Sequence, residues 1–308
     1  VSRIREEGLK AAKIHTDDTP VPMLVPGKGK TAQARLWTHV VDDRASGSTG
    51  PALVWYKFTL DRSGIHPQTE LKTFTGLLQA DGYAGYDKLY QDGRIREVAC
   101  WAHFRRKIFE NHQASPTPLT TDLLERIAGL YRIEDDVRGQ PPDIRRQQRQ
   151  EHSKPQIETL HSVIDDALRR LSPKSSMAKA LTYGRKRWDA LTRYLGEGIA
   201  EMDNNIAERS IRSIAIGRKN WLFTGSKAGG TRAAAISLTM KVTCFAQFNA
   251  TTSRPERTKI SIQMQRPLAL TDAFCWPSQP DGQRRRRPAG PYIITDVPAL
   301  RHGRTGPA

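Results

Sequence analysis

A nearly continuous run of apolar and aromatic residues, ALVWYKFTL at 52–60, most restricts the folds open to this chain. Such a run is typical of a strand that is buried on both faces in the middle of a sheet. Shorter strand patterns precede it at 14–17 and 36–41. A Gly- and Lys-rich loop at 26–31 and a turn at 42–50 leave only short connections between the three, which predicts an antiparallel meander.

Two more apolar runs, at 74–80 and 98–102, predict a fourth and a fifth strand. From about residue 112 to 188 the apolar residues recur at helical spacing, as in Leu123, Ile127 and Leu130. A polar, basic stretch with prolines at 138–155 interrupts them, and we expect it to be an exposed connection followed by the start of a helix. The pattern predicts an α/β fold in which a mixed sheet flanked by helices is interrupted by a mostly helical insertion.

These patterns divide the chain into four expected parts. Residues 1–111 form the first part of the α/β core, 112–190 the helical insertion, and 191–243 the second part of the core with the helix that carries Glu208. Residues 244–308 are a basic tail with four successive arginines at 284–287 among prolines. Such composition is typical of a disordered segment.

The charge balance favours a polyanionic partner. Lys and Arg number 49 against 32 Asp and Glu, a formal net charge of +17. Neutralising phosphates releases condensed counterions, so nucleic acid is the favoured partner, with a ribosomal or merely soluble basic protein as the alternative. Three scattered cysteines, no secretory signal and no apolar run of about 20 residues predict a cytoplasmic, nucleoid-associated protein without a membrane partner.

Acidic residues follow two of the predicted strands. Asp17 and Asp18 end the first strand, and Asp81 follows the fourth. If these strands are neighbours in one sheet, the carboxylates meet at one edge, where they repel unless a hard cation such as Mg²⁺ lies between them. Paired metal ions can activate a water or a 3′-hydroxyl for attack on a phosphodiester. Glu208, on a predicted helix, is the natural third carboxylate.

Each of these acids also has an ordinary structural interpretation. Asp81 precedes Gly82 in a common turn sequence, and the Asp17–Asp18 pair before Thr-Pro fits a turn as well. Asn205 and Glu208 have the spacing of a capping box, with Asn205 as the N-cap. Pattern alone leaves the catalytic and the structural interpretations open.

Four ordered motifs decide between them. The chain contains HTDDTPVPMLVPGKGKTAQARLWTHVVDDR, LQADGYAGYDKLY, CWAHFRRKIFE and DNNIAERSIRSIAIGRKNWLFTGSKAGGTRAAA. Together they resemble the transposases of the insertion-sequence-66 family, which belong to the DDE group of RNase H-like enzymes. The resemblance implies a catalytic and metal-binding triad of Asp17, Asp81 and Glu208 that uses Mg²⁺ or Mn²⁺. Asp18 stands where the family often has a second acid.

The resemblance further implies metal-dependent cleavage at transposon ends and transfer of a 3′-hydroxyl to target DNA, by a homo-oligomer on the DNA. Five cations surround or follow Glu208 and are predicted to contact DNA phosphates: Arg209, Arg212, Arg218, Lys219 and Lys227. Glycines that lie between these cations in the sequence allow the backbone to approach the DNA closely.

Cys100 and His103 form a CxxH pair, which is half of a zinc site. With no second pair nearby, we expect a structural role at the end of the fifth strand, and a supporting role near the active site stays open.

Full-length relatives carry an N-terminal region that this sequence lacks, and the resemblance ends near Leu238 in a way that suggests a frameshifted tail. The alternative function is therefore a degenerate, inactive fragment that binds DNA without cutting it. A nonspecific RNase H-like nuclease is a third hypothesis.

Overall fold

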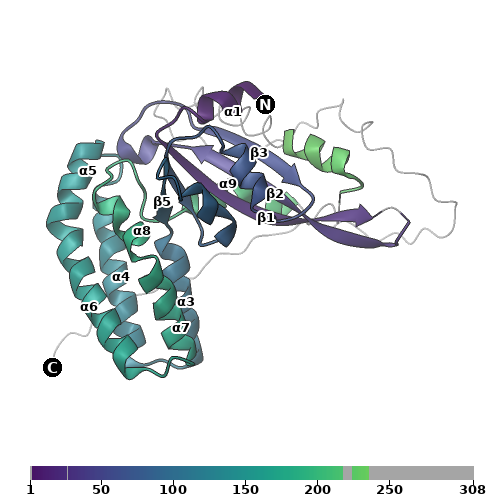
Figure 1. Ribbon diagram of the computed structural model, residues 1–308. Coiled ribbons are helices and arrows are strands. Elements are labelled where there is room, and N and C mark those ends of the chain that lie inside the picture. Colours follow the sequence, from purple (N-terminus) through teal and green to yellow (C-terminus); the bar gives the residue numbers. More distant parts are fainter. Residues whose placement is uncertain (1, 26, 218–223, 236–308) are drawn as a thin grey trace, which may run out of the picture. The chain divides into compact units, whose positions relative to one another are not determined.

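The computed structural model describes residues 2–25, 27–217 and 224–235. In this part the chain forms a five-stranded sheet with the order β3-β2-β1-β4-β5 (Figure 1). The strands are β1 (Lys13–Val25), β2 (Lys30–Val41), β3 (Leu53–Thr59), β4 (Gly76–Ala80) and β5 (Ile95–Ala99). The first three form the predicted antiparallel meander, and β4 and β5 run parallel to β1. This mixed sheet confirms the predicted α/β, RNase H-like class.

β1 is much longer than predicted. The sequence prediction ended this strand at Asp17, but it continues through Pro20 and Pro22 to Val25. β4 pairs with β1 only at residues 13–15. Beyond residue 15 the side of β1 that faces away from β2 is an edge of the sheet, apart from a bridge between Met23 and Thr224. On this edge the carbonyl of Pro22 accepts a hydrogen bond from the backbone N–H of Thr224. The N and the carbonyl of one strand residue point to the same side, so the nitrogen of Pro22, which carries no hydrogen, also points away from β2. Proline is tolerated on such an edge because the ladder with β2 loses no donor.

Helices cover both faces of the sheet and fill the segment between β5 and the end of the core. The helices are α1 (Ser2–Gly8), α2 (Ile65–Glu70), α3 (Trp101–Ala114), α4 (Pro118–Asp136), α5 (Pro142–Gln148), α6 (Lys154–Arg170), α7 (Ser176–Lys186), α8 (Trp188–Thr192) and α9 (Asn205–Gly217). Short 3₁₀ turns occur at η1 (Arg44–Ser46), η2 (Ala84–Leu89) and η4 (Arg193–Leu195), and η3 (Arg149–Ser153) is a π-helical turn. A further helix spans 227–235.

The side chains of the sheet alternate between two apolar clusters. Ile14 and Trp37 pack with residues of η2, whereas Val21 and Leu36 pack on the opposite face near Ile214 of α9. A third cluster joins β4 and β5 to the helical segment, because Leu77 and other strand residues pack with α3, α4, α6 and α7. The helical segment therefore rests directly on the sheet. Its first helix, α3, begins at Trp101.

In the polar stretch at 138–155 an exposed connection at 138–141 leads into a helix, as predicted, but two of its arginines are buried. The stretch forms α5 and η3, and the side chains of Arg145 and Arg149 are only 1% and 0% exposed. Arg149 makes two hydrogen bonds of 2.7 Å with the carboxylate of Glu134. Buried charges need such partners, and these partners come from elements that lie far away in the sequence.

Several predictions fall outside the part of the chain that the structure describes. The tail at 244–308 lies there, as do Arg218 and Lys219. The boundaries of the four predicted parts stay predictions. Of the helices in the described ranges, none is both long and apolar enough to cross a bilayer.

Candidate active site

The parallel pairing of β1 with β4 brings two of the predicted acids side by side. The pairing ends where His15 lies opposite Gln79, and Asp17 and Asp81 each follow two residues further along, close enough for the charge of Asp81 to act on Asp17. Side chains two residues apart point to the same face of a sheet. Asp17 therefore shares a face with His15, and this is the face on which α9 packs.

α9 contributes the third acid. Glu208 lies in its first turn and faces an open cavity of about 320 Å³ that Asp17 also borders. The residues that line this cavity are Asp17, Asp18, Thr19, His103, Arg106, Glu208, Ile211 and Arg212. Asp81 does not line it, but its charge acts on Asp17.

The beginning of α9 contradicts the capping-box interpretation of Glu208. The carbonyl of Asn204 accepts hydrogen bonds from the backbone N–H groups of Ala207 and Glu208, at 3.1 and 3.3 Å. Asn204 is thus the residue that precedes the first turn, and Glu208 is the fourth residue of the helix rather than the third. Asn205 instead donates from its side chain to Asp203, at 2.6 Å. Glu208 is left to face the cavity.

The charges of the other acids at the site all act on the carboxyl group of Asp17. Its pKa is raised from 3.8 to about 7, chiefly because burial disfavours the charged form. The charges of Asp81, Asp18 and Glu208 act in the same direction, whereas a 2.8 Å hydrogen bond from the backbone N–H of Asp18 opposes them. A carboxylate in these surroundings would gain from a bound cation.

Asp18 has a different role from its neighbour. Its carboxylate is 1% exposed and accepts hydrogen bonds from Arg35 at 3.1 Å and from Arg62 at 2.8 to 3.2 Å. Both oxygens are therefore occupied by guanidinium groups. Alternation along β1 points this side chain to the face opposite that of Asp17. We assign Asp18 to a structural ion pair.

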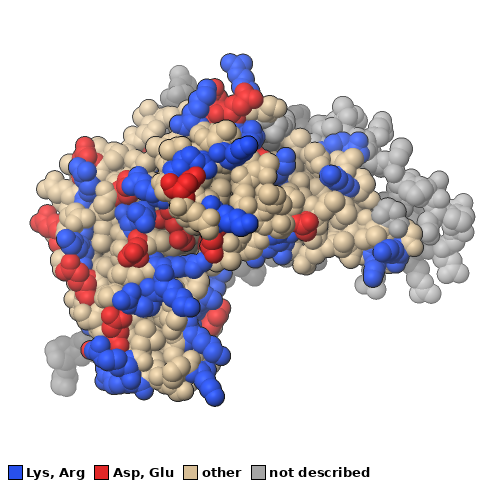
Figure 2. Space-filling view, viewed as in Figure 1, with Lys and Arg blue, Asp and Glu red and all other residues tan. Residues whose placement is uncertain are grey.

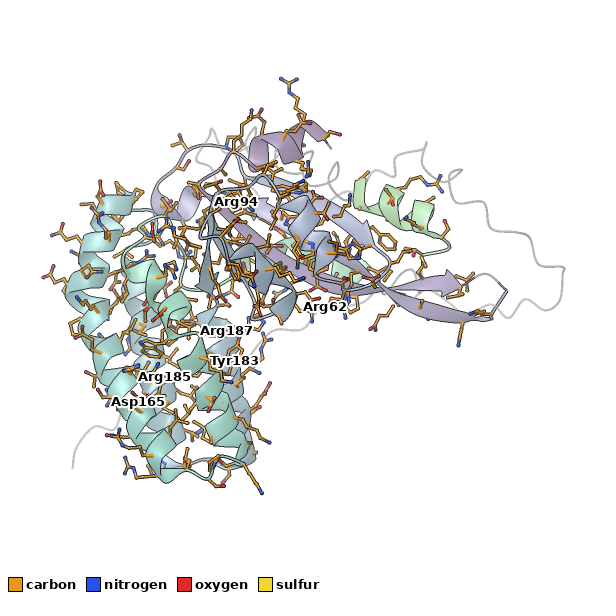
Figure 3. The ribbon with its side chains drawn as sticks, viewed as in Figure 1. Arg62, Arg94, Asp165, Tyr183, Arg185 and Arg187 are labelled. Atoms are coloured by element: carbon orange, nitrogen blue, oxygen red, sulfur yellow. The ribbon has the colours of Figure 1, made fainter. Side chains whose placement is uncertain are left out.

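The network around Asp18 extends to Asp81. Arg62 also lies 3.6 Å from the carboxylate of Asp81, and its guanidinium stacks 4.1 Å from the ring centre of Tyr83. On the other side, Arg187 donates to the carbonyl of Gly82 at 2.9 Å. Figure 3 labels Arg62 beside the sheet and Arg187 at the adjoining end of the insertion helices. The turn that carries Asp81 is thus held from both sides.

The donor atoms at this site suit a hard divalent cation. Carboxylate oxygens are the ligands that Mg²⁺ and Mn²⁺ prefer, and the repulsion at Asp17 would be relieved by either ion. Within the described ranges, however, no three His, Cys, Asp or Glu side chains lie close enough together to hold one ion. The three acids share a region of the fold without forming a closed set of ligands.

The predicted DNA contacts separate into two places. Arg212 lines the cavity, and Arg209 is exposed on the same helix. Lys227 is exposed on the helix at 227–235, which packs through Gly230 and Ala234 on the other end of the sheet. Figure 2 shows further Lys and Arg side chains over the insertion helices next to the sheet.

Comparison with known proteins now places the chain. A family model described as the IS66 family of transposases matches residues 1–232. The chain belongs to the IS66 transposase family. Both the resemblance noted in the motifs and the predicted fold class are thereby confirmed.

Three curated relatives come from Sinorhizobium fredii (strain NBRC 101917 / NGR234). The uncharacterized protein y4qI is 38% identical over 248 residues, which cover 78% of this chain and 46% of the relative. The uncharacterized proteins y4hP and y4jD are 35% and 34% identical, over 76% and 71% of this chain and 45% and 44% of their own lengths. The IS66 chain thus spans less than half the length of these relatives.

His103 and Arg106 also line the cavity, although they were not among the predicted site residues of this IS66 chain. His103 and Arg106 are three residues apart on α3, so they share a face of the helix, and both line the cavity with Asp17. The motif CWAHFRR contained the signal, because its CxxH pair left a supporting role for His103 open. Among the described residues, Nδ1 of His103 has no hydrogen-bond partner.

Cys100, the other half of the CxxH pair, is structural. It precedes the first turn of α3, its side chain is buried, and its sulfur accepts a hydrogen bond from the backbone N–H of Asn204 at 3.2 Å. Burial raises the pKa of the Cys100 thiol to about 12, so the thiol stays protonated.

Proposed function

We propose that this chain is the catalytic part of a transposase that cleaves and joins DNA phosphodiester bonds, with divalent metal ions held by Asp17, Asp81 and Glu208. One observation carries the proposal. The parallel pairing of β1 with β4 directs Asp17 and Asp81 to the same edge of the sheet, and α9 carries Glu208 at the cavity that Asp17 borders, which supports a shared metal site. Membership of the IS66 transposase family supports the same chemistry.

Mg²⁺ or Mn²⁺ bound by these carboxylates would activate the attacking hydroxyl or water and stabilise the leaving oxygen. The chain's own cations would hold the DNA. Arg106 and Arg212 approach the cavity from α3 and α9, where they can bind the phosphates on either side of the scissile bond. Ile211 supplies an apolar wall between the charged groups. The proposed partners are transposon ends and target DNA, bound by a homo-oligomer.

A second function, DNA binding without cleavage, is favoured by a different observation. No three acidic, His or Cys side chains within the described ranges are close enough to hold one ion. A chain with this arrangement could occupy the ends of the element through its basic residues and leave them intact. The two functions differ in whether divalent metal produces a DNA product.

The deciding experiment is a cleavage and strand-transfer assay with Mg²⁺ or Mn²⁺, on DNA that carries the ends of the encoding element. The parent chain is compared with Glu208→Gln, which keeps the shape of the side chain but removes its charge. Glu125→Gln is the matched control, because Glu125 is exposed on α4 far along the chain from the acids. We expect Glu208→Gln to lose activity by at least about 100-fold, since an anionic ligand is lost, and Glu125→Gln to keep it.

Binding is measured in the same samples by gel shift without metal, and folding by thermal melting. Glu208→Gln should bind DNA and melt like the parent. Activity in Glu208→Gln close to that of the parent would exclude Glu208 from the catalytic set. A metal-independent gel shift without any product in the parent would favour the binding function. Equal cutting of DNA without element ends would indicate a nonspecific nuclease.

A further inference from the structure

The segment that leads into α9 is held along its whole length by hydrogen bonds to its carbonyl groups. From 197 to 204, every backbone carbonyl accepts a hydrogen bond from a side chain or a backbone N–H. Arg149 and Arg145, from the helical insertion, bind the first part of the segment. Lys13 of β1 binds the carbonyl of Ile199 at 2.7 Å. An irregular segment acquires a fixed path when its carbonyls are satisfied in this way.

Gln79 connects the segment to the strand that carries Asp81. It lies on β4 two residues before Asp81, and its side chain is 0% exposed. Its amide nitrogen donates to the carbonyls of Glu201 at 2.5 Å and of Asp203 at 2.9 Å. Its amide oxygen accepts from the backbone N–H of Glu201 at 3.1 Å. Both the nitrogen and the oxygen of this buried amide therefore form hydrogen bonds with the segment.

Asn204 makes the corresponding connection to the strand that carries Asp17. Its side-chain nitrogen donates to the carbonyl of Thr16 at 2.8 Å, and its oxygen lies 3.1 Å from Nδ1 of His15. Its own carbonyl accepts the hydrogen bond from the backbone N–H of Glu208 that opens α9. One buried residue thus contacts the neighbour of Asp17 and the first turn that contains Glu208.

The acids themselves cannot provide this geometry. Asp17, Asp81 and Glu208 repel one another, so the turn of α9 must be held near the strands by groups other than the carboxylates. Amides suit this task because they bond in both directions and add no charge to the site. We propose that Gln79 and Asn204 are positioning residues that fix Glu208 relative to Asp17 and Asp81, so that a divalent cation can be shared among them. This inference rests on the proposed function.

The test uses the full chain with Gln79→Met and Asn204→Leu, which keep side-chain size and add no charge but remove the side-chain hydrogen bonds. Gln150→Met is the matched control, because Gln150 donates to the carbonyl of Leu195, outside the held segment, at 2.9 Å. Ile164→Val, in the core of the insertion, controls for a general loss of stability. The first measurement, made without metal, is hydrogen exchange of the backbone amide of Glu208.

We expect this amide to exchange at least about 10-fold faster in Gln79→Met and Asn204→Leu than in the parent or the controls. The second measurement is Mn²⁺ binding to the DNA-free protein by titration calorimetry. Groups that orient metal ligands typically change metal affinity by about 10- to 100-fold, and we expect weakening of this size in the two variants only. Ile164→Val should melt earlier and bind Mn²⁺ like the parent.

Unchanged exchange at Glu208 in both variants would overturn the inference, whether or not the parent is active. Faster exchange together with Mn²⁺ affinity equal to that of the parent would overturn it as well, since the residues would then stabilise α9 without positioning a ligand. A parent chain that binds no Mn²⁺ would instead refute the proposed function. In that case the exchange of Glu208 alone decides whether Gln79 and Asn204 hold α9 in place.

Discussion

The neighbouring residues Asp17 and Asp18 should respond in opposite ways to the same substitution. In protein kept free of metal with EDTA at pH 8, we expect Asp17→Asn to raise the free energy of unfolding and Asp18→Asn to lower it. The reason is that Asp17 is a buried carboxylate near other acids, whereas Asp18 is a buried carboxylate between two guanidinium groups.

The magnitude for Asp17 follows from its pKa, which is raised from 3.8 to about 7. At about 1.4 kcal/mol for each pKa unit, the ionised side chain costs the folded state at most about 4 kcal/mol above pH 7. Water in the open cavity screens part of this cost, so we expect Asp17→Asn to gain about 1–3 kcal/mol. Between pH 3.8 and 7 the folded chain keeps a proton that the unfolded chain releases. The gain should therefore vanish near pH 4 and grow as the pH rises.

The magnitude for Asp18 follows from its ion pairs. Removing one partner of a buried pair typically costs about 3–5 kcal/mol. Arg35 and Arg62 are 19% and 37% exposed, so they can partly rehydrate, and we expect a loss of about 2–4 kcal/mol. For a chain of this size 1 kcal/mol corresponds to about 2–4 °C in Tm, so the two variants should melt at least about 6 °C apart.

The assay is thermal melting with EDTA from pH 4 to pH 8, with Asp136→Asn as the control. Asp136 is exposed at the end of α4, and its substitution should change the stability by no more than about 0.5 kcal/mol. If Asp17→Asn melted below the parent at pH 8, the folded state would stabilise the Asp17 carboxylate, and the clustering of acids inferred here would be wrong. If Asp17 is a metal ligand, as we propose, addition of Mn²⁺ should raise the Tm of the parent and not that of Asp17→Asn.

Two further predictions concern the fold and the DNA. His39 is fully buried, and burial lowers its pKa to about 4. Between pH 6.5 and 4 the unfolded chain takes up a proton that the folded chain refuses, so His39 should lower the stability by up to about 3 kcal/mol, which opposes the gain from Asp17 over the same range. In denaturant titrations the difference between the parent and His39→Leu should show this loss, and a difference that does not change with pH would show that His39 is protonated in the fold. Replacing Arg106 and Arg212 together with alanine should lower the salt dependence of DNA binding by about 2 in slope, about 0.9 for each phosphate contact. A slope equal to that of the parent would place both arginines outside the DNA interface.

Much of the sheet could be predicted from the sequence because its signals are local. The apolar run that became β3 and the turn at 42–50 specify a meander without reference to anything distant. The prediction that this run lies in the middle of the sheet was wrong, because β3 is an edge strand. The acids were also visible, since Asp81 directly follows a strand. The family resemblance then selected Asp17 over Asp18, and the alternation of the pleat now provides a physical reason for that choice.

What could not be predicted depends on partners that are remote in the chain. Arg145 and Arg149 stand in a polar stretch that has the composition of a surface loop. They are buried because carbonyls about 45 to 53 residues later accept their hydrogen bonds. Gln79 and Asn204 were missed for the same reason, since their bonds span 104 to 189 positions. Local periodicity carries no information about such pairs.

The arrangement of charge around Glu208 explains why a basic segment keeps this carboxylate. Within the described residues no ion pair joins Glu208 to Arg106, Arg209 or Arg212, although Arg212 lies one helical turn from Glu208 and lines the same cavity. Acids that were merely balanced by these arginines would pair with them, as Asp18 pairs with Arg35. Charges of both signs therefore stay available beside one cavity. We expect a phosphodiester with its metal ion to engage both, since such a ligand brings a cation for the acids and an anion for the arginines.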